Sequence, residues 1–341
     1  MAPTSSLRVL ASRRESVPDS PQPDYTEGKL GMTDRPDGAL RSSAVPSDKT
    51  LSPPSLAWQT EAVDDLRPVR IIRPPAFSFG TIISGVQTLV KYADLLWILS
   101  LFRLNVRYKQ SALGWIWAAL QPLALMTIYT IVFTRVTSVS TGGIPYPLFV
   151  LSALLPWLFF SASISNAVHG LVLYPNLLTK MYFPREIIPL SYLAAGFMDF
   201  LIGCMILAGF MAHYRVLPTW NLLYAIPIMI VLAAFAAAVA LLFSAVHVRF
   251  RDIGLALPLL LQVWMFTIPV VYSLQAVPLR FRKLYLLDPI SGLIENFRTV
   301  LLEGRSPDTS SLAMSAGIAF AGLVIAYAYF KSSEALMADI I

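Results

Sequence analysis

Six long runs of apolar residues follow one another between residues 112 and 330, and they predict membrane-spanning helices. A helix needs about 20 apolar residues to cross the hydrocarbon core of a bilayer, and each run is close to or above that length. The predicted spans are residues 112–133, 147–168, 187–211, 222–246, 253–274 and 312–330. Glycine, proline and serine within them fit this prediction, because neighbouring helices can satisfy the backbone groups that such residues leave open. The pattern predicts an all-α integral membrane protein with six transmembrane helices in a domain of residues 111–341.

A different pattern precedes the first span. Between residues 82 and 104 apolar side chains recur with helical spacing, while Lys91 and Asp94 lie on the opposite face. A spanning helix would rarely keep these two charges with so few apolar neighbours. We therefore expect residues 81–110 to form an interfacial amphipathic helix in the plane of the membrane surface, rather than an ordinary soluble one.

The segment between the fifth and sixth predicted spans, residues 275–305, is charged and amphipathic. Asp288 and Pro289 are typical of a helix start, with aspartate as the N-cap and proline in the first helical position. Residues 279–287 form a second short amphipathic piece before it. Each half is too short and too charged to span, so we expect two re-entrant half-helices in the outer leaflet. A plain exposed loop is the alternative, but it would leave Phe297 in water.

The first 80 residues differ in composition from the rest of the chain. They contain 11 of its 25 prolines, together with many serines and charges of both signs. Such a segment cannot bury enough apolar surface to offset the entropy lost on ordering, and it has no short apolar run of the kind a signal peptide needs. We expect residues 1–80 to be a disordered cytoplasmic tail. Six spans then place both termini in the cytoplasm.

Composition supports the membrane class and excludes several others. Of the 341 residues, 56% are hydrophobic and 13% are charged, against about 25% charged in soluble domains. A single cysteine, Cys204, excludes a disulfide framework. The net charge of +6 fits basic loops beside anionic lipid, and no basic groove interleaved with aromatics indicates nucleic-acid binding.

The motifs of common catalytic sites are absent from the sequence. It contains no GxxxxGK(S/T), HExxH or GxSxG pattern, so we expect neither a nucleotide site nor an enzyme in this chain, and no cofactor of its own. Asp199 is the acidic residue that lies deep within a predicted span. An intramembrane carboxylate is a candidate functional group, but a proton relay would use several in series, so we favour a structural hydrogen-bonding role.

A charged and aromatic connection, residues 174–191, joins the second and third predicted spans. A connection that only reversed the chain would favour small polar residues. This one presents large apolar and aromatic side chains next to charge, a combination suited to docking into a partner. We interpret it as the contact through which a soluble motor protein pulls on a membrane channel. The residues assigned to this motor contact are Lys180, Met181, Tyr182, Phe183, Pro184, Arg185 and Glu186.

Aromatic residues are frequent in the first two predicted spans. The candidates are Trp115, Trp117, Tyr129, Phe133, Trp157 and Phe160. Aromatic rings near span ends are often interfacial belt residues. Flat rings also pack against the C–H faces of sugars without fixed hydrogen-bond geometry, which would suit a sliding polysaccharide. Composition leaves both interpretations open.

Five short motifs, in this order, resemble the permeases of type-2 ABC exporters, specifically the polysaccharide exporters of O-antigen, capsule and teichoic acid. They are RYKQSALGW at residues 107–115, LPW at 155–157, KMYFPREIIP at 180–189, RDI at 251–253 and ENFR at 295–298. The resemblance covers residues 85–331. Two features depart from the pattern: Asp288 stands where the family usually has asparagine, and the N-terminal extension is longer than is typical.

The resemblance implies a half-channel. Two copies would form a homodimer around a continuous pore in a bacterial inner membrane, and two separate ATP-binding cassette subunits would bind and hydrolyse ATP below it. The cargo would be a lipid-linked glycan, such as a lipopolysaccharide O-antigen or a capsule polysaccharide. Its anionic headgroup would meet Arg103, Arg107 and Lys109 at the cytoplasmic face, although these residues could also be simple positive-inside anchors. The outer half-helices would form a gate, with Tyr285, Asp288, Glu295, Phe297 and Arg298 as its residues.

Two alternatives remain at this point. A type-2 ABC exporter of a lipid or a drug would lack an aromatic-lined continuous pore. A membrane-embedded enzyme that acts on lipid-linked sugars would need a cluster of ionisable residues at one membrane depth, and the sequence offers only Asp199.

Overall fold

The computed structural model describes residue 85 and residues 87–109, 111–135, 141–173, 183–274, 277–278, 280, 285 and 287–340. The predicted tail of residues 1–80 lies outside these ranges, and so do Lys180, Met181 and Tyr182 of the motor contact. Every regular element within the described ranges is helical, which confirms the all-α class.

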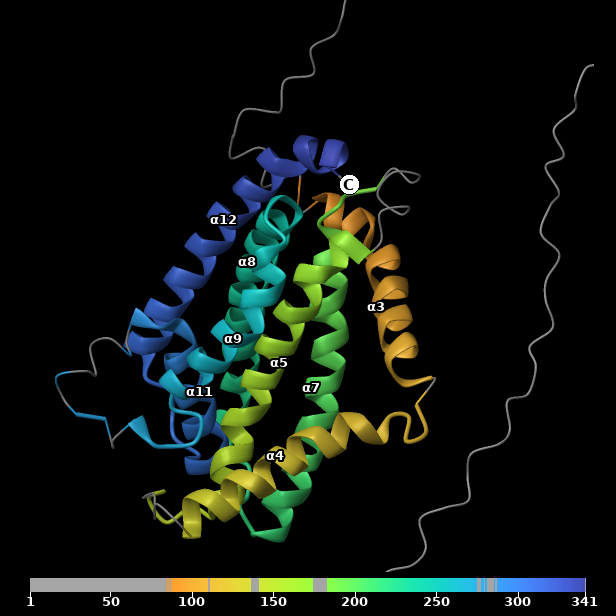
Figure 1. The fold of residues 1–341 in the computed structure, drawn as a ribbon. Helices are drawn as coiled ribbons and strands as arrows, with labels where there is room; N and C mark the ends of the chain where they lie inside the picture. Colours follow the sequence, from red (N-terminus) through yellow and green to blue (C-terminus); the bar gives the residue numbers. More distant parts are fainter. Residues whose placement is uncertain are drawn as a thin grey trace, which may run out of the picture. The chain divides into compact units, whose positions relative to one another are not determined.

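The α-helices follow one another in the order that the apolar runs predict (Figure 1). They are α3 (Ala93–Tyr108), α4 (Ile116–Arg135), α5 (Tyr146–Leu173), α7 (Ile187–His213), α8 (Ala225–Arg249), α9 (Asp252–Thr267), α11 (Pro289–Arg298) and α12 (Thr309–Ile340). A 3₁₀ turn, η1 (Trp220–Tyr224), leads into α8, and a π-helical turn, η3 (Thr299–Glu303), follows α11. In the described chain, five segments are long and apolar enough to cross a membrane: α4, α5, α7, η1 with α8, and α12 as far as Glu334.

The fifth predicted span is shorter than the sequence suggests. α9 has 16 residues, and at about 1.5 Å per residue its length is about 24 Å, less than the roughly 30 Å of a hydrocarbon core. The helix ends at Thr267 because Pro269 follows closely, and the residue before a proline is disfavoured in the helical region. Ile268 is accordingly extended, with φ −88° and ψ 155°. The prediction of a helix that continues to residue 274 is wrong at its C-terminal end.

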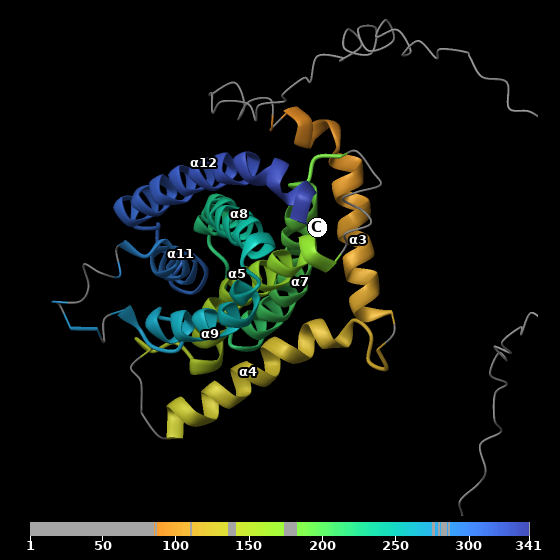
Figure 2. The same cartoon turned by 45° about the horizontal axis from the view of Figure 1, so that its top comes forward.

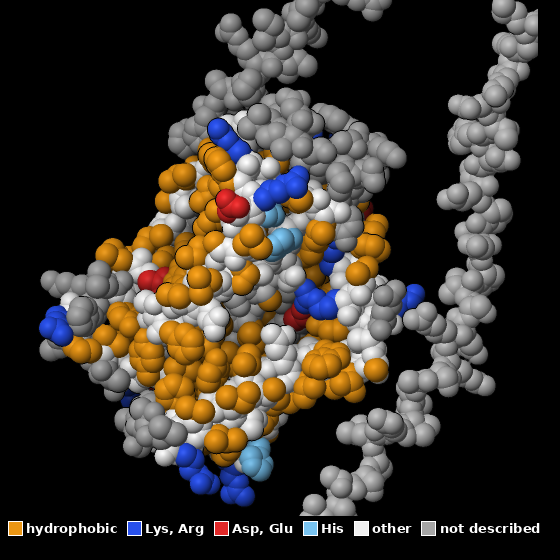
Figure 3. Space-filling model, in the orientation of Figure 1, with side chains coloured by type: hydrophobic (Ala, Val, Ile, Leu, Met, Phe, Trp, Pro, Cys, Tyr) orange, Lys and Arg blue, Asp and Glu red, His pale blue; other side chains and the backbone are white. Residues whose placement is uncertain are grey.

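α5 lies at the centre of the packing, with α7, α8, α9 and α11 around it (Figures 1 and 2). Almost every residue from Tyr146 to Pro156 is buried, as expected of a helix that is hydrophobic on all sides. α12 packs along α8, and α4 lies against α5 and α7. Large apolar side chains of α4 and α9 are exposed, and hydrophobic groups cover most of the face drawn in Figure 3. Such an apolar surface suits a lipid environment.

α3 packs against α7 (Figure 1). The guanidinium of Arg103 lies 4.3 Å from the ring centroid of Tyr192, and one turn later Arg107 and Tyr108 bond to Asp199. These contacts hold α3 against α7. The in-plane orientation of α3 at the membrane surface stays a prediction.

The predicted helix start at Asp288 is confirmed, with proline in the first helical position. Oδ2 of Asp288 accepts hydrogen bonds from the backbone N–H of Ser291 at 3.3 Å and from its hydroxyl at 2.6 Å. Phe297 and Leu301 are only 3% and 9% exposed, so the alternative of an exposed loop is wrong for this half of the outer segment. Most of the other half, residues 279–287, lies outside the described ranges.

Candidate functional site

Glu186, which the sequence assigns to the motor contact, is buried inside the protein with 0% of its surface exposed. Its carboxylate accepts hydrogen bonds from Nζ of Lys331 at 2.9 Å and from the hydroxyl of Tyr327 at 3.3 Å. Both partners belong to α12. A buried carboxylate needs such partners because removing its charge from water is costly. In this conformation Glu186 therefore binds α12 and has no surface to offer another protein.

The three residues before Glu186 are half-buried. The guanidinium of Arg185 donates a hydrogen bond to the backbone carbonyl of Glu334, which is also in α12. The ring of Phe183 packs at the edge of the hydrophobic core, and Pro184 lies beside it. Phe183 and Pro184 thus retain some exposed apolar surface, and their contact with a motor protein stays a prediction.

The three basic residues assigned to the headgroup come from one stretch of α3. Arg107 forms an ion pair with Asp199, and the hydroxyl of Tyr108 donates to the other carboxylate oxygen at 2.9 Å. Arg103 is 7% exposed and precedes Arg107 by four residues, which places both on the same helix face. Lys109, at the end of α3, is exposed. The structure thus brings Arg103 and Arg107 together and leaves Lys109 at the edge.

Asp199 is the member of this cluster whose partners the sequence did not reveal. Both of its carboxylate oxygens are bonded, one to Arg107 and one to Tyr108, which confirms the predicted structural hydrogen-bonding role. The sequence does indicate that Asp199 has a partner, because a carboxylate in the middle of a predicted span requires a cationic or hydrogen-bonding group. The sequence did not show which of several basic residues would supply it.

Arg298, a predicted gate residue, is fully buried at the point where α9 ends. It donates hydrogen bonds to Glu295 at 2.9 Å and to the backbone carbonyls of Pro269 at 3.0 Å and Val270 at 3.2 Å. Its guanidinium also lies 3.7 Å from the ring centroid of Phe149. Burial lowers the pKa of Arg298 to about 10, so the side chain stays charged at neutral pH. Arg298 therefore satisfies backbone carbonyls of the two residues that follow Ile268, just beyond the end of α9.

The other predicted gate residues lie in the same outer region. The hydroxyls of Tyr285 and Tyr272 are 2.8 Å apart, and Tyr272 donates to the carbonyl of Thr267, the last residue of α9. Burial raises the pKa of the Asp288 carboxyl above its ordinary value, although its bonds to Ser291 act in the opposite direction. Two of the predicted gate residues, Tyr285 and Arg298, thus reach the end of α9. Whether they act as a gate stays a prediction.

The sequence carries a family signature over most of these elements. The family model described as "ABC-2 type transporter" matches residues 94–302, which run from the start of α3 to η3. The chain belongs to the ABC-2 type transporter family. Similar proteins include the "O-antigen export system permease protein RfbA" of Myxococcus xanthus, 30% identical over 256 residues, or 74% of this chain and 98% of that protein. A protein of the same description from Klebsiella pneumoniae is 31% identical over 161 residues, or 47% of this chain and 61% of its own length. These findings confirm the family that the five motifs resemble.

In this ABC-2 transporter chain, the aromatic residues of the first predicted span are partly accessible. Trp115 and Trp117 are 50% and 48% exposed, and Trp115 stacks on Tyr108 with 4.9 Å between ring centroids. Tyr129 and Phe133 form an edge-to-face pair at 6.4 Å and pack against the core. The two tryptophans therefore remain candidates for contact with a glycan.

The aromatic residues of the second predicted span have a different position. Trp157 is 3% exposed and Phe160 is 0% exposed. The ring of Phe160 is stacked on Phe235 at 5.6 Å and meets the edge of Trp264 at 5.3 Å. Both residues belong to the core of one chain, so the prediction that they line a pore is wrong for this structure. The centre of α5 needs large apolar side chains for packing.

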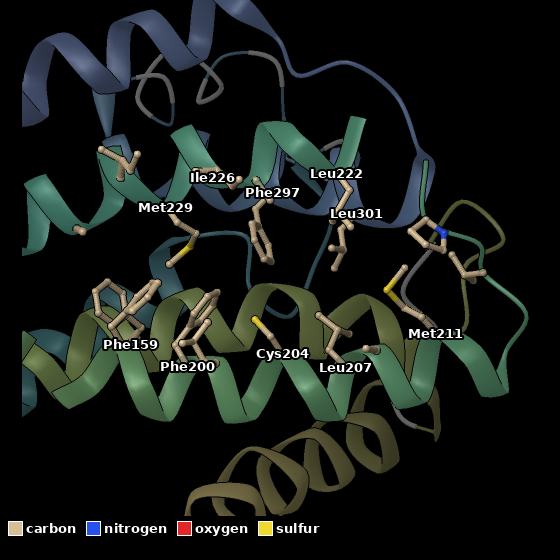
Figure 4. Close-up of a pocket in the computed structure, with 18 of the residues that line it drawn as sticks. Phe159, Phe200, Cys204, Leu207, Met211, Leu222, Ile226, Met229, Phe297 and Leu301 are labelled. Atoms are coloured by element: carbon tan, nitrogen blue, oxygen red, sulfur yellow. The ribbon is translucent and has the colours of Figure 1, made fainter. Parts of the chain in front are cut away.

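The ABC-2 transporter chain also has an apolar groove that the sequence analysis did not predict (Figure 4). The groove lies between α7 and α8, has a volume of about 780 Å³ and is lined by apolar side chains. Phe297 and Leu301 extend into it from α11 and η3, and Cys204 lies on its α7 side. A groove between two helices depends on their tertiary arrangement, which a hydropathy pattern does not contain.

Several charged side chains of the transporter form ion pairs with one another. Within the described ranges, no group of three or more His, Cys, Asp or Glu could hold a metal ion. Two ion pairs instead join elements that are distant in sequence. Arg107–Asp199 joins α3 to α7. Glu186–Lys331 joins residues 183–186, the described part of the motor contact and here called the motor segment, to α12. Each pair therefore links a helix to an element that is distant from it in the sequence.

Proposed function

We propose that this chain is the transmembrane subunit of an ATP-driven exporter that moves a polysaccharide across a bacterial inner membrane. The similarity to the Myxococcus xanthus O-antigen export permease carries this proposal, because it covers 98% of that protein at 30% identity. Five apolar helices of spanning length support multi-pass insertion. A lipid-linked glycan of the O-antigen or capsule type is the cargo that fits best.

ATP hydrolysis belongs to a separate partner subunit in this proposal. We expect that subunit to bind at the segment before α7, where Phe183 and Pro184 keep exposed apolar surface. The same end of the bundle holds Glu334 near the end of α12, through its contact with Arg185. We assign this end to the cytoplasm, together with both chain termini.

A homodimer with two ATP-binding subunits completes the proposed exporter. The exposed apolar faces of α4 and α9 support a second copy of this chain, because they offer broad surfaces without a covering helix in the described chain. Ile131 of α4 is 59% exposed, and Leu255, Leu259 and Val263 of α9 are 83%, 65% and 58% exposed. In the dimer α9 serves as the fifth span, and the break at its end is covered by α11 as a re-entrant half-helix.

The cargo is proposed to meet the chain first at the cluster on α3. Arg103, Arg107 and Lys109 carry three positive charges against the one negative charge of Asp199, which leaves a net charge of +2. Such a cluster suits the diphosphate of a lipid-linked glycan. The half-exposed rings of Trp115 and Trp117 follow directly, and they suit the C–H faces of sugar units. Gating at the far side is assigned to Tyr285, Asp288, Glu295, Phe297 and Arg298.

The motor contact can be tested with the separate ATP-binding subunit of the proposed exporter. We expect Phe183→Asp to abolish co-purification of that subunit and to remove glycan from the cell surface, because a charge replaces the apolar surface at the contact. The matched control is Trp220→Asp, an equivalent replacement of an exposed aromatic residue at the opposite end of α7. The measurements are a pull-down from detergent and fluorescent labelling of periodate-oxidised surface glycan.

The two variants separate the possible outcomes. If the wild-type chain binds the ATP-binding subunit and exports glycan, and Phe183→Asp inserts normally but does neither, the proposal stands. If Phe183→Asp binds and exports as the wild type does, residues 183–184 are only part of a turn. If the wild-type chain itself binds no ATP-binding subunit, the proposed function is wrong.

A further inference from the structure

The burial of Glu186 is unusual for a residue in the segment before α7. A charge with 0% exposure must be compensated by its neighbours, and replacing a buried ion pair by apolar residues of similar size is often neutral or stabilising. The stability of the fold alone therefore does not require an ion pair between Glu186 and Lys331. The best-attested use of a buried ion pair is to fix one relative position of two elements.

The contacts of this segment converge on one stretch of α12. Glu186 bonds to Tyr327 and Lys331, and Arg185 bonds to the backbone of Glu334. Nζ of Lys331 also pairs at 3.2 Å with Glu334, whose side chain is partly exposed. Two adjacent residues thus contact about two turns of α12, so a displacement of the segment would displace that part of α12.

The opposite end of α12 is joined to α11, which carries the predicted gate residues. A Cβ atom at Gly292 would lie 2.7 Å from the hydroxyl of Ser311 and 2.8 Å from that of Ser315, so α11 and α12 approach each other closely at this glycine. The side-chain oxygen of Asn296 accepts a hydrogen bond of 2.7 Å from the backbone N–H of Asp308, just before α12. α11 and α12 are therefore closely packed at this end.

A continuous helix connects the two contacts. From Ser311 to Tyr327 α12 advances 16 residues, or about 24 Å at about 1.5 Å per residue. α12 is one continuous helix over this stretch and contains no proline, which is the commonest cause of a sharp kink. Arg298 of α11 in turn donates hydrogen bonds to the carbonyls of Pro269 and Val270, just beyond the end of α9.

We propose that Glu186 is a positioning residue that transmits the movement of the motor segment to α12, and that α12 carries this movement to the outer end of the bundle. The inference rests on the proposed function, since it assumes that an ATP-binding subunit moves residues 183–186. It assigns different roles to neighbouring residues. Phe183 contacts the motor, whereas the Glu186–Lys331 pair connects the segment to the far side.

The test compares binding of the motor with export in the full complex. Glu186→Gln removes the charge but keeps the size of the side chain. We expect the variant to co-purify with the ATP-binding subunit and to hydrolyse ATP within about twofold of the wild type, while surface glycan falls at least about tenfold, because one partner of a buried pair is lost. Glu334→Gln is the matched control, since it removes a half-exposed carboxylate from the same lysine. It should export almost as the wild type does.

A charge-reversed pair tests whether the interaction between the two charges, and not either side chain alone, supports export. The variant combines Glu186→Lys with Lys331→Glu, in a Glu334→Gln background so that the new glutamate has no carboxylate beside it. We expect it to recover at least about a third of wild-type export, since the pairwise term of a double-mutant cycle isolates this interaction. Failure to recover, at normal membrane levels, would overturn the proposal.

The remaining outcomes are also decisive. If Glu186→Gln no longer binds the ATP-binding subunit, or exports as the wild type does, Glu186 is not a relay. If the wild-type chain neither binds that subunit nor exports glycan, the proposed function fails instead. Should Glu186→Gln not accumulate in the membrane, Tyr327→Phe takes its place, because it removes only the hydroxyl that bonds Glu186. An export level equal to that of the wild type in this variant would contradict the proposal.

Discussion

Replacing Arg298 with alanine is expected to destabilise the protein by about 3–5 kcal/mol, because the change empties a buried site and leaves two buried backbone carbonyls without a donor. The substitution leaves Glu295 without its partner and the carbonyls of Pro269 and Val270 without a donor. It also empties the space beside the ring of Phe149. The measurement is the midpoint of thermal unfolding of the detergent-solubilised chain, followed by circular dichroism.

An arginine from the same outer segment serves as the control. Arg305 is 77% exposed and pairs with Glu303 at 3.4 Å, and exposed pairs of this kind contribute about 0–1 kcal/mol. Arg305→Ala should therefore shift the unfolding midpoint little. A midpoint for Arg298→Ala equal to that of Arg305→Ala would show that the end of α9 does not depend on the buried guanidinium.

Replacing Asp199 with alanine is expected to release α3 from α7 and to lower export roughly thirtyfold, which corresponds to about 2 kcal/mol of lost charged hydrogen bonding. Arg107 would keep its charge at the surface of a membrane span without a carboxylate, and Tyr108 would lose its acceptor. Surface glycan is the readout for export. Protease sensitivity of residues 93–109 in membrane vesicles is the readout for release of α3.

The double variant Asp199→Leu with Arg107→Leu distinguishes a structural link from a contact with cargo. It removes both charges together, which is often tolerated where the loss of one is not, so α3 should again resist the protease. Export should stay low if Arg107 also binds the anionic headgroup, and it should recover if Arg107 only anchors α3. Normal protease resistance in the single variant Asp199→Ala would contradict the link between α3 and α7.

Features that depend on local sequence could be predicted. Runs of apolar residues identified the spanning helices, and aspartate followed by proline identified the start of α11, because an N-cap and the following turn involve neighbouring residues. The early end of α9 was also encoded locally, in Pro269. The apolar pattern does not reveal this end, because the run stays apolar beyond Pro269 and hydropathy does not register the loss of helical geometry before a proline.

Pairing between distant residues could not be predicted in the same way. Arg107 and Asp199 are 92 positions apart, and Glu186 and Lys331 are 145 positions apart. Each charge has several possible partners in the sequence, and only the packing of helices selects one. The aromatic residues show the same limit, because a ring in an apolar run can face the core or the surface. Trp117 and Phe160 look alike in sequence and have opposite exposures.

The ion pair between α3 and α7 has a consequence for the electrical work of transport. A single charge that moves across a membrane potential of 100 mV exchanges about 2.3 kcal/mol with the field. Arg107 and Asp199 carry opposite charges at the same place, so a movement that carries both residues together transfers no net charge from this pair. The pair itself therefore contributes no gating charge.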